Sequence, residues 1–209
     1  MGRDEILNKI SKGARASVIL GFIFAIGGLI VSILMFIMGT NSDNVVFLII
    51  MLALFAVGVV ILIFNIPQML DPMKSKFIRK NPDILKMADE LYSNIVYQDK
   101  TLMFSPRIIA NACDIRQMAY TDEVFLIYVY IHKTNGVTDL KQLRLETARE
   151  TINLPIIYKK DDEINSLIGQ ILQHCRYARV GYNDDGMAYL RQMRELWKQD
   201  QARKHMRLN

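Results

Sequence analysis

Residues that could do acid–base, nucleophilic or metal chemistry are few in this chain, and they are far apart. The three histidines, His132, His174 and His205, lie outside any HExxH or CxxC context, so their spacing predicts no metal site. His174 and Cys175 are the only adjacent base and thiol. Neighbouring residues on a helix point about 100° apart, and we therefore do not expect a catalytic pair there.

Acidic clusters do not supply an active site either. Asp161-Asp162-Glu163 and Asp184-Asp185 precede apolar helical patterns, where carboxylates stabilise the positive end of a helix dipole. The chain contains no Gly-rich phosphate loop, no GxSxG elbow and no kinase or nucleotide-binding signature. We predict a protein that is not an enzyme and that needs no cofactor or metal; an enzyme of an unfamiliar kind remains a third hypothesis.

The remaining residues that could hold a ligand are cations. The formal net charge is +5, and four basic residues follow the second of two long apolar runs: Lys74, Lys76, Arg79 and Lys80. Cations at such a position can contact anionic lipid headgroups, or they can act only as a topology anchor. These four are the candidates for lipid contact.

Those two apolar runs are Ser17–Met38 and Val45–Phe64, and neither contains Asp, Glu, Lys, Arg or His. Each holds roughly 20 residues, which is enough for a helix to cross the ~30 Å hydrocarbon core of a bilayer. A cleaved signal peptide is the rival interpretation of the first run, but the run is too long and a second one follows at once. We predict a transmembrane helical hairpin over residues 17–66, with spans at 17–38 and 45–64.

Basic residues on both sides of this hairpin predict its orientation. Four lie in residues 1–16, none in the loop Gly39–Asn44, and four just after the second span. The positive-inside rule then places both termini in the cytoplasm, as in a multi-pass protein of the cell membrane. Cys113 and Cys175 agree with this placement, because a cytosolic domain needs no disulfide.

Small residues recur on one face of the first span. Gly21, Ala25 and Gly28 continue a helical pattern that begins at Ser17 and ends at Ser32, and small side chains let helix backbones approach closely. We expect this face to pack on the second span within the hairpin. A homodimer through the same stripe, or docking to other membrane subunits, is the alternative.

The chain changes character after Pro67. The second span is expected to end at Asn65-Ile66-Pro67, and residues 67–94 form a basic connector. An amphipathic helix is expected at its end, from the N-cap Asn81-Pro82-Asp83 to about Ser93.

Strand-like periodicity follows, and residues 95–182 are predicted to form one cytoplasmic domain. Val124–Ile131 is almost continuously apolar, which predicts a strand buried on both faces, one of them against the connector helix or the membrane side; a helix is the alternative. Thr134-Asn135-Gly136 predicts a turn, and an amphipathic helix begins at Asp161. Seven strands are expected, at 95–98, 101–104, 107–111, 116–119, 124–133, 141–146 and 150–156.

This order of strands and one closing helix resembles a pleckstrin-homology-like (PH-like) barrel. The likeness is more specific in Ile127-Tyr128, His132-Lys133-Thr134-Asn135-Gly136-Val137, Leu143-Arg144-Leu145 and Ile152-Asn153-Leu154, and in the closing segment from Cys175 to Tyr182. Over approximately residues 95–183 the chain resembles uncharacterised two-pass membrane proteins of Gram-positive bacteria. The resemblance implies an α+β membrane protein, with a helical hairpin followed by an antiparallel β-barrel or meander; it carries over no activity. Arg176 and Arg179 make this chain more basic than the pattern.

A further basic helix is predicted for residues 183–209. Met187, Leu190, Met193 or Arg194, and Trp197 form a docking stripe, and Arg191, Arg194 and Lys198 lie on the other face. The basic end could be solvated, could touch the membrane surface or could bind nucleic acid. Nucleic acid is disfavoured because no reader motif accompanies the charges.

The sequence therefore favours a non-enzymatic, membrane-anchored PH-like binding or scaffolding module at the cytoplasmic face. Its partners would be anionic lipid headgroups or a protein that the sequence does not identify, and a homodimer is possible. The alternative is an accessory or regulatory subunit of a larger integral membrane complex.

Overall fold

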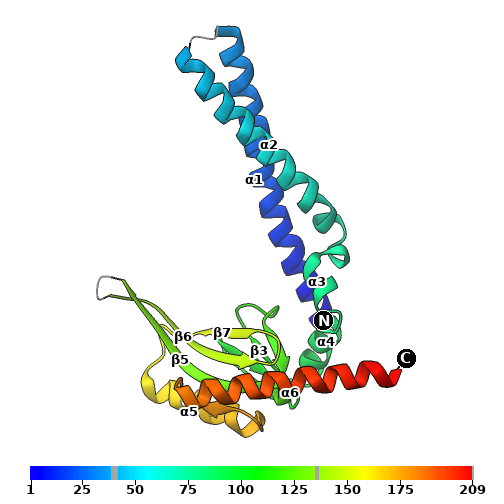
Figure 1. Cartoon of the computed structure of the whole chain (residues 1–209), viewed down its shortest axis with the longest axis vertical. Coiled ribbons are helices and arrows are strands. Elements are labelled where there is room, and N and C mark those ends of the chain that lie inside the picture. Colours follow the sequence, from blue (N-terminus) through cyan, green and yellow to red (C-terminus); the bar gives the residue numbers. More distant parts are fainter. Residues whose placement is uncertain (39–41, 135–136, 209) are drawn as a thin grey trace. The chain divides into compact units, whose positions relative to one another are not determined.

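The computed structural model describes residues 1–38, 42–134 and 137–208 (Figure 1). The chain divides into two compact units, Arg3–Leu85 and Lys86–Asn209. Residues 39–41 of the expected loop Gly39–Asn44, and Asn135 and Gly136 of the expected hairpin turn, lie outside the described residues. The layout is α+β, with two long apolar helices followed by sheets and further helices.

Two helices, α1 (Gly2–Met38) and α2 (Ser42–Leu70), form the first unit's apolar part. Both are long and apolar enough to cross a membrane. At ~1.5 Å per residue the 37 residues of α1 extend well beyond a ~30 Å bilayer core. The charged residues between positions 3 and 15 do not interrupt α1, because Lys, Arg and Glu are good helix formers.

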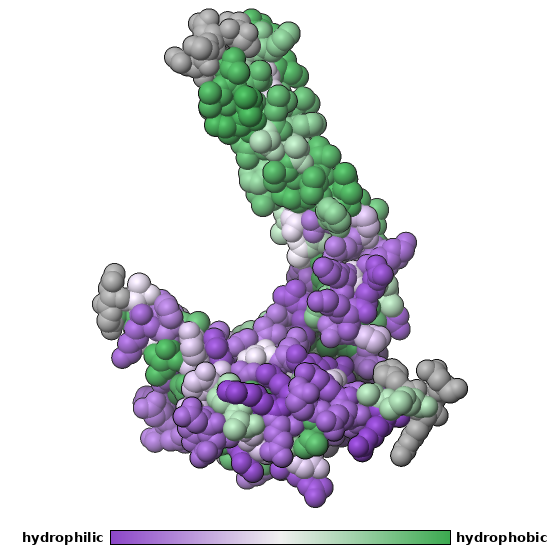
Figure 2. Space-filling model, viewed as in Figure 1, coloured by the Kyte–Doolittle hydropathy of each residue, from purple (hydrophilic) through white to green (hydrophobic). Residues whose placement is uncertain are grey.

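Large apolar side chains of α1 and α2 face outward. Only 6% of the apolar stretch of α2 is buried, and side chains such as Ile23, Ile63 and Phe64 are more than half exposed. Figure 2 shows this surface as a continuous hydrophobic zone that gives way to hydrophilic residues at one end of the hairpin. An apolar surface of this extent is not sustained in water, so it needs an apolar surrounding.

The end of α2 differs from the expectation. Pro67 does not stop the helix, which continues to Leu70; Asn65 and Gln68 donate side-chain hydrogen bonds to the carbonyls of Ile61 and Phe64. A proline removes only its own N–H, so a last helical turn can follow it. The helix then passes into η1 (Pro72–Lys74) and α3 (Lys76–Lys80). The next helix, α4 (Ile84–Ser93), begins two residues after the expected Pro82, which lies in a turn.

Two four-stranded sheets make up the centre of the second unit, and all seven expected strands form. The first sheet is the antiparallel meander β1 (Tyr97–Gln98), β2 (Leu102–Phe104), β3 (Ile108–Asn111) and β4 (Met118–Tyr120). The second has the order β7-β6-β5-β8, from β5 (Val124–Thr134), β6 (Val137–Thr147), β7 (Thr151–Pro155) and β8 (Arg179–Val180). A short helix, η2 (Thr121–Glu123), links them.

These sheets do not close into the barrel that we expected, at least across the described strands. Side chains connect them instead. Asn111 donates to the carbonyl of Asn153 over 2.8 Å, and the Asn153 N–H donates to Gln117 over 2.9 Å. Strands β3 and β7 therefore lie next to one another without a backbone ladder.

Helix α5 (Asp161–His174) completes the main core, as its periodicity predicted. Ile164, Leu167 and Ile171 are buried in one cluster with residues of both sheets, among them Ile109 of the first and Leu145 of the second. Burial of such side chains contributes about 1.5–3 kcal/mol each.

The outer face of β5 carries a second apolar cluster. Helix α6 (Asp184–Leu208) covers it, with Leu190 buried beside Phe125, Leu126 and Tyr128. The expected burial of both faces is thus present only over Val124–Tyr128, where α6 covers the outer face; Val129 and Ile131 are exposed. The predicted docking stripe is confirmed: Met187, Met193 and Trp197 pack against the same cluster.

Candidate functional site

The four candidate lipid-contact residues come from two short helices after α2. Asp71 accepts the Met73 N–H and so begins η1, which carries Lys74. The buried Ser75 accepts the Ile78 N–H over 3.3 Å and begins α3. Serine and aspartate are preferred N-caps, so the sequence itself places both starts.

On α3, Lys76, Arg79 and Lys80 stand at i, i+3 and i+4, which puts them on one side of the helix. Ile78 is buried and holds the opposite side. The basic face of α3 is therefore presented outward by packing of its apolar residue.

All four cations line one cavity with the end of α2. Its volume is about 610 Å³, and its apolar wall consists of residues from the last turns of α2. Among the described residues, no acidic side chain lines it. Lys74 pairs with Asp71 over 3.5 Å, where both side chains are largely solvated; within the described part of the chain, Lys76, Arg79 and Lys80 have no carboxylate within 4.0 Å. The lining residues are Ile63, Phe64, Pro67, Gln68, Lys74, Lys76, Arg79 and Lys80. We call this cavity the basic pocket.

The chemistry of the basic pocket matches an amphiphilic anion. Lysine and arginine side chains can hold phosphate oxygens by charge-assisted hydrogen bonds. The exposed rings and chains of Ile63, Phe64 and Pro67 offer an apolar surface directly beside them. An anionic lipid has two matching parts next to each other, a charged headgroup for the cations and an acyl chain for the apolar surface.

Further cations lie at this end of the hairpin. The Ser11 hydroxyl donates to the Met69 carbonyl over 3.4 Å, so the first part of α1 lies beside the last turn of α2. The first turns of α1 also carry basic side chains: Arg3, Lys9, Lys12 and Arg15. Both groups of cations are therefore at the same end of the two apolar helices.

The small residues of α1 lie against α2. A Cβ added to Gly28 would stand 2.8 Å from the Met51 carbonyl oxygen, and one added to Gly58 would stand 2.5 Å from the Ala25 nitrogen. A Cβ added to Gly21 would stand 3.0 Å from the Ile61 side chain of α2, whereas one added to Gly27 would have no described atom within 4 Å. The structure thus brings Gly21, Ala25 and Gly28 to the contact between the two helices.

The sequence's adjacent base and thiol both lie against residues of the main core. Cys175 is buried in the main core, and this burial raises the pKa of its thiol to about 12, so it carries no thiolate near neutral pH. The His174 ring packs on Phe104 with centroids 4.5 Å apart. Across residues 1–38, 42–134 and 137–208, no group of three or more His, Cys, Asp or Glu could hold a metal ion.

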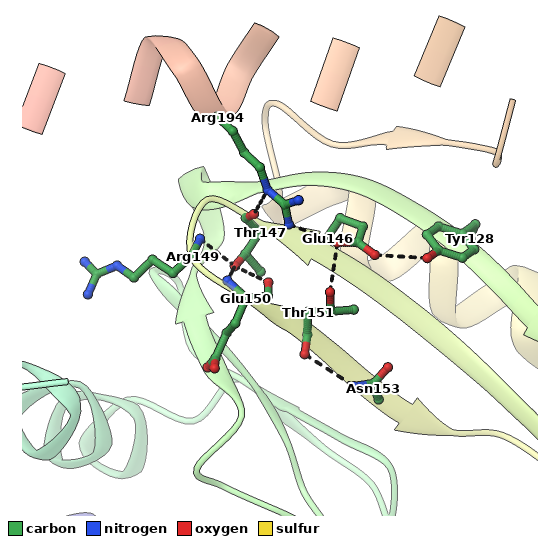
Figure 3. Close-up of polar contacts among 8 residues, drawn as sticks. All are labelled: Tyr128, Glu146, Thr147, Arg149, Glu150, Thr151, Asn153 and Arg194. Carbon is green, nitrogen blue, oxygen red and sulfur yellow. Dashed lines mark hydrogen bonds and ion pairs between the residues drawn. The ribbon is translucent and has the colours of Figure 1, made fainter. Parts of the chain in front are cut away.

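A polar network beneath α6 was not predicted (Figure 3). Glu146 on β6 accepts hydrogen bonds from Tyr128 (2.9 Å), Thr151 (2.8 Å) and Arg194 of α6 (2.9 Å). Burial and the Glu146 carboxylate raise the pKa of the Tyr128 hydroxyl, which keeps its proton and donates. Arg194 also donates to the Thr147 carbonyl over 2.8 Å. Arg194 therefore belongs to the docking face of α6, one of the two positions that the sequence left open for it.

No protein-family model matches the chain, and no curated protein or solved structure is significantly similar to it.

Sequence reasoning missed residues on the outer face of β5 and β6. Tyr128, Tyr130, Arg144 and Glu146 all point to this face, because Tyr128 pairs with Arg144 and side chains alternate along strands. This alternation is visible in the sequence and could have grouped them. Tyr182 gave no such signal, because it follows a two-residue strand that has no periodicity.

Proposed function

We propose that the chain is a non-enzymatic, membrane-anchored binding module of the cytoplasmic face of the cell membrane. In this proposal α1 and α2 span the bilayer, both termini are cytoplasmic, and the sheets with α5 form a PH-like domain that holds a protein partner. The basic pocket holds an anionic lipid headgroup. We do not propose a nucleic-acid partner.

One observation carries the proposal: four cations converge on a cavity whose other wall is the apolar end of α2. Each Lys or Arg near an anionic membrane surface contributes about 1 kcal/mol of binding free energy. The position of the α1 cations beside the same end supports the proposed orientation, because the positive-inside rule places Lys and Arg on the cytoplasmic side. The PH-like assignment is supported by the strand order and by the packing of α5 on both sheets.

The accessory-subunit alternative requires a free helix face for a second membrane protein. Gly21, Ala25 and Gly28 would be that face, but α2 lies against them. The same contact argues against a homodimer through this stripe. A partner that co-purifies with residues 1–80 alone would favour the alternative over the binding module.

Lipid retention tests the basic pocket. The full chain, purified in micelles with phosphatidylcholine and phosphatidylglycerol, is compared by native mass spectrometry with the variant Lys76→Gln, Arg79→Gln, Lys80→Gln. A control with the same charge change on the second unit carries Lys100→Gln, Lys133→Gln and Lys160→Gln.

We expect the wild type and the control to retain phosphatidylglycerol in preference to phosphatidylcholine, and the first variant to lose that preference. An equal loss of the phosphatidylglycerol preference in both variants would mean that net charge, and not the basic pocket, attracts the lipid. The lipid part of the proposal would then be withdrawn.

A further inference from the structure

Strand β5 has an edge that is only partly covered. Strand β8 pairs with it in parallel at Leu126 and Ile127, and the Gly181 N–H donates to the Ile127 carbonyl over 2.9 Å. Gly181 then takes a φ of +114°, a conformation that glycine adopts readily, and the chain turns away. The covering strand therefore stops there, while β5 continues to Thr134.

The next backbone groups along this edge are open. Because the Ile127 carbonyl points to the β8 side, alternation directs the N–H and C=O of Val129 and Ile131 to the same side. Within the part of the chain that the structure describes, no residue forms a backbone hydrogen bond with them there. Such an unpaired row is a template for another strand.

A cavity of about 280 Å³ adjoins this open edge. Tyr128, Tyr130 and Tyr182 line it together with Arg144, and the Tyr128 and Tyr182 rings lie 4.7 Å apart. The Arg144 guanidinium stacks on the Tyr130 ring at 3.6 Å. Aromatic rings of this kind offer a rigid contact surface that costs little conformational entropy on binding.

The charge of this cavity selects an acidic partner. The Nε of Arg144 is buried without a hydrogen-bond partner, and among the described residues no carboxylate lies within 4.0 Å of its guanidinium. The Glu146 carboxylate on the same face is already engaged, because it accepts hydrogen bonds from Tyr128, Thr151 and Arg194. A guanidinium forms strong bidentate hydrogen bonds with a carboxylate.

The two faces of the edge differ in polarity. Tyr128, Tyr130 and Arg144 lie on the outer face, whereas the half-exposed Val129 and Ile131 side chains point to the other face. A strand added here would meet cationic and aromatic groups on one side and apolar groups on the other. That environment fits a peptide in which acidic and apolar residues alternate.

We propose that the free edge of β5 at Val129–Ile131 binds an extended segment of a protein partner, with alternating acidic and apolar residues, whose carboxylates meet Arg144. The inference names a partner class for the binding module and rests on that proposal for its setting at the membrane. Main-chain hydrogen bonds supply affinity in this recognition mode, and the side-chain pockets supply specificity.

Fluorescence anisotropy with the full chain in phosphatidylcholine nanodiscs tests whether the free edge of β5 binds such a peptide. The probe is a labelled peptide Thr-Val-Glu-Val-Glu-Val-Thr; one comparison peptide has Gln in place of both Glu, and another is N-methylated at alternate amides. N-methylation removes strand pairing but keeps the side chains. We expect the acidic probe to bind, the Gln peptide to bind about tenfold more weakly, and the N-methylated peptide not to bind.

Chain variants locate the site. Val129→Pro removes an outward N–H without touching the β5–β6 ladder, and edge strands tolerate proline there; Val129→Thr keeps that N–H and is its control. Arg144→Gln is compared with Arg191→Gln on the exposed side of α6. We expect Val129→Pro and Arg144→Gln to weaken binding about tenfold or more, and both controls to bind like the wild type.

The inference is overturned if the wild type does not bind the acidic probe, or if the N-methylated peptide binds as tightly as the unmodified one. The latter comparison needs no variant and stands even if Val129→Pro fails to fold. Peptide binding by a chain that shows no preference for phosphatidylglycerol would keep this inference and remove the lipid part of the proposed function; the reverse result would remove only the inference.

Discussion

Arg194 of α6 donates a hydrogen bond to Glu146 of β6 over 2.9 Å, and this ion pair joins the C-terminal helix to the second sheet (Figure 3). Both side chains are largely buried, and Glu146 also accepts from Tyr128 and Thr151. Through Glu146, Arg194 therefore links α6 to polar side chains of three strands, β5, β6 and β7.

Replacing Arg194 by Gln should loosen α6. The change leaves the Glu146 carboxylate without its charged donor, and we expect the free energy of unfolding of the second unit to fall by about 1–2 kcal/mol. Trp197, the only tryptophan, lies on α6 and donates to Glu123, so its fluorescence during urea unfolding reports the release of this helix. Arg191→Gln, at an exposed position, should change stability by less than about 0.5 kcal/mol. Equal effects of both variants would show that the ion pair does not hold α6.

The pH dependence of stability should include a contribution from Asp99. Burial opposes its ionisation, but hydrogen bonds from Lys159 (2.7 Å) and from the Leu102 and Thr101 N–H groups are together stronger, so its pKa lies below the ordinary 3.8. A lowered carboxyl pKa stabilises the fold above its unfolded-state value and ceases to do so as the pH falls through the folded value.

We therefore expect Asp99→Asn to lower the unfolding midpoint relative to the wild type near pH 7, and the difference to shrink below about pH 4. The measurement is thermal unfolding of both proteins in micelles between pH 3 and pH 8. Lys159, whose pKa the hydrogen bond to Asp99 raises above 10.5, stays charged throughout this range. A difference that is the same at pH 3 and pH 7 would contradict the account.

Two adjacent glycines of α1 should respond differently to leucine. A Cβ at Gly28 would collide with the Met51 carbonyl and the Phe55 backbone, whereas a Cβ at Gly27 would have no described atom within 4 Å. Gly28→Leu should therefore separate α1 from α2, and Gly27→Leu should not.

Crosslinking reports this separation. Cysteines at Ser11 and Met69, whose residues are in contact at 3.4 Å, are joined by a short bismaleimide in a background with Cys113→Ser and Cys175→Ala. We expect the intramolecular crosslink to form in the Gly27→Leu protein and to be lost or strongly reduced in the Gly28→Leu protein. The opposite order would mean that the small-residue stripe faces away from α2.

Hydrophobic patterning predicted the elements well where it extended over many residues. The two apolar runs lie in α1 and α2, the almost continuous apolar run Val124–Ile131 lies in β5, and the stripe with Leu190 and Trp197 docks α6. These features depend on local periodicity, which a single sequence displays directly.

Features that depend on tertiary contacts were predicted less well. Arg194 sits at the border of the α6 stripe, where spacing alone cannot separate a docking residue from a solvated one, and only its distance to Glu146 decides. Strand β8 has two residues and no period. Lys74, Lys76, Arg79 and Lys80 were identified as cations near a membrane, but their shared cavity depends on the caps of η1 and α3.

Labelling of cysteines in intact cells tests the central claim, that the hairpin anchors the second unit at the cytoplasmic face. The variant Ser42→Cys places a thiol at the connection between α1 and α2, and the native Cys113 is exposed on the second unit. A membrane-impermeant maleimide should modify the thiol at position 42 in intact cells and should reach Cys113 only after lysis. Modification of Cys113 in intact cells, with position 42 protected, would contradict the account.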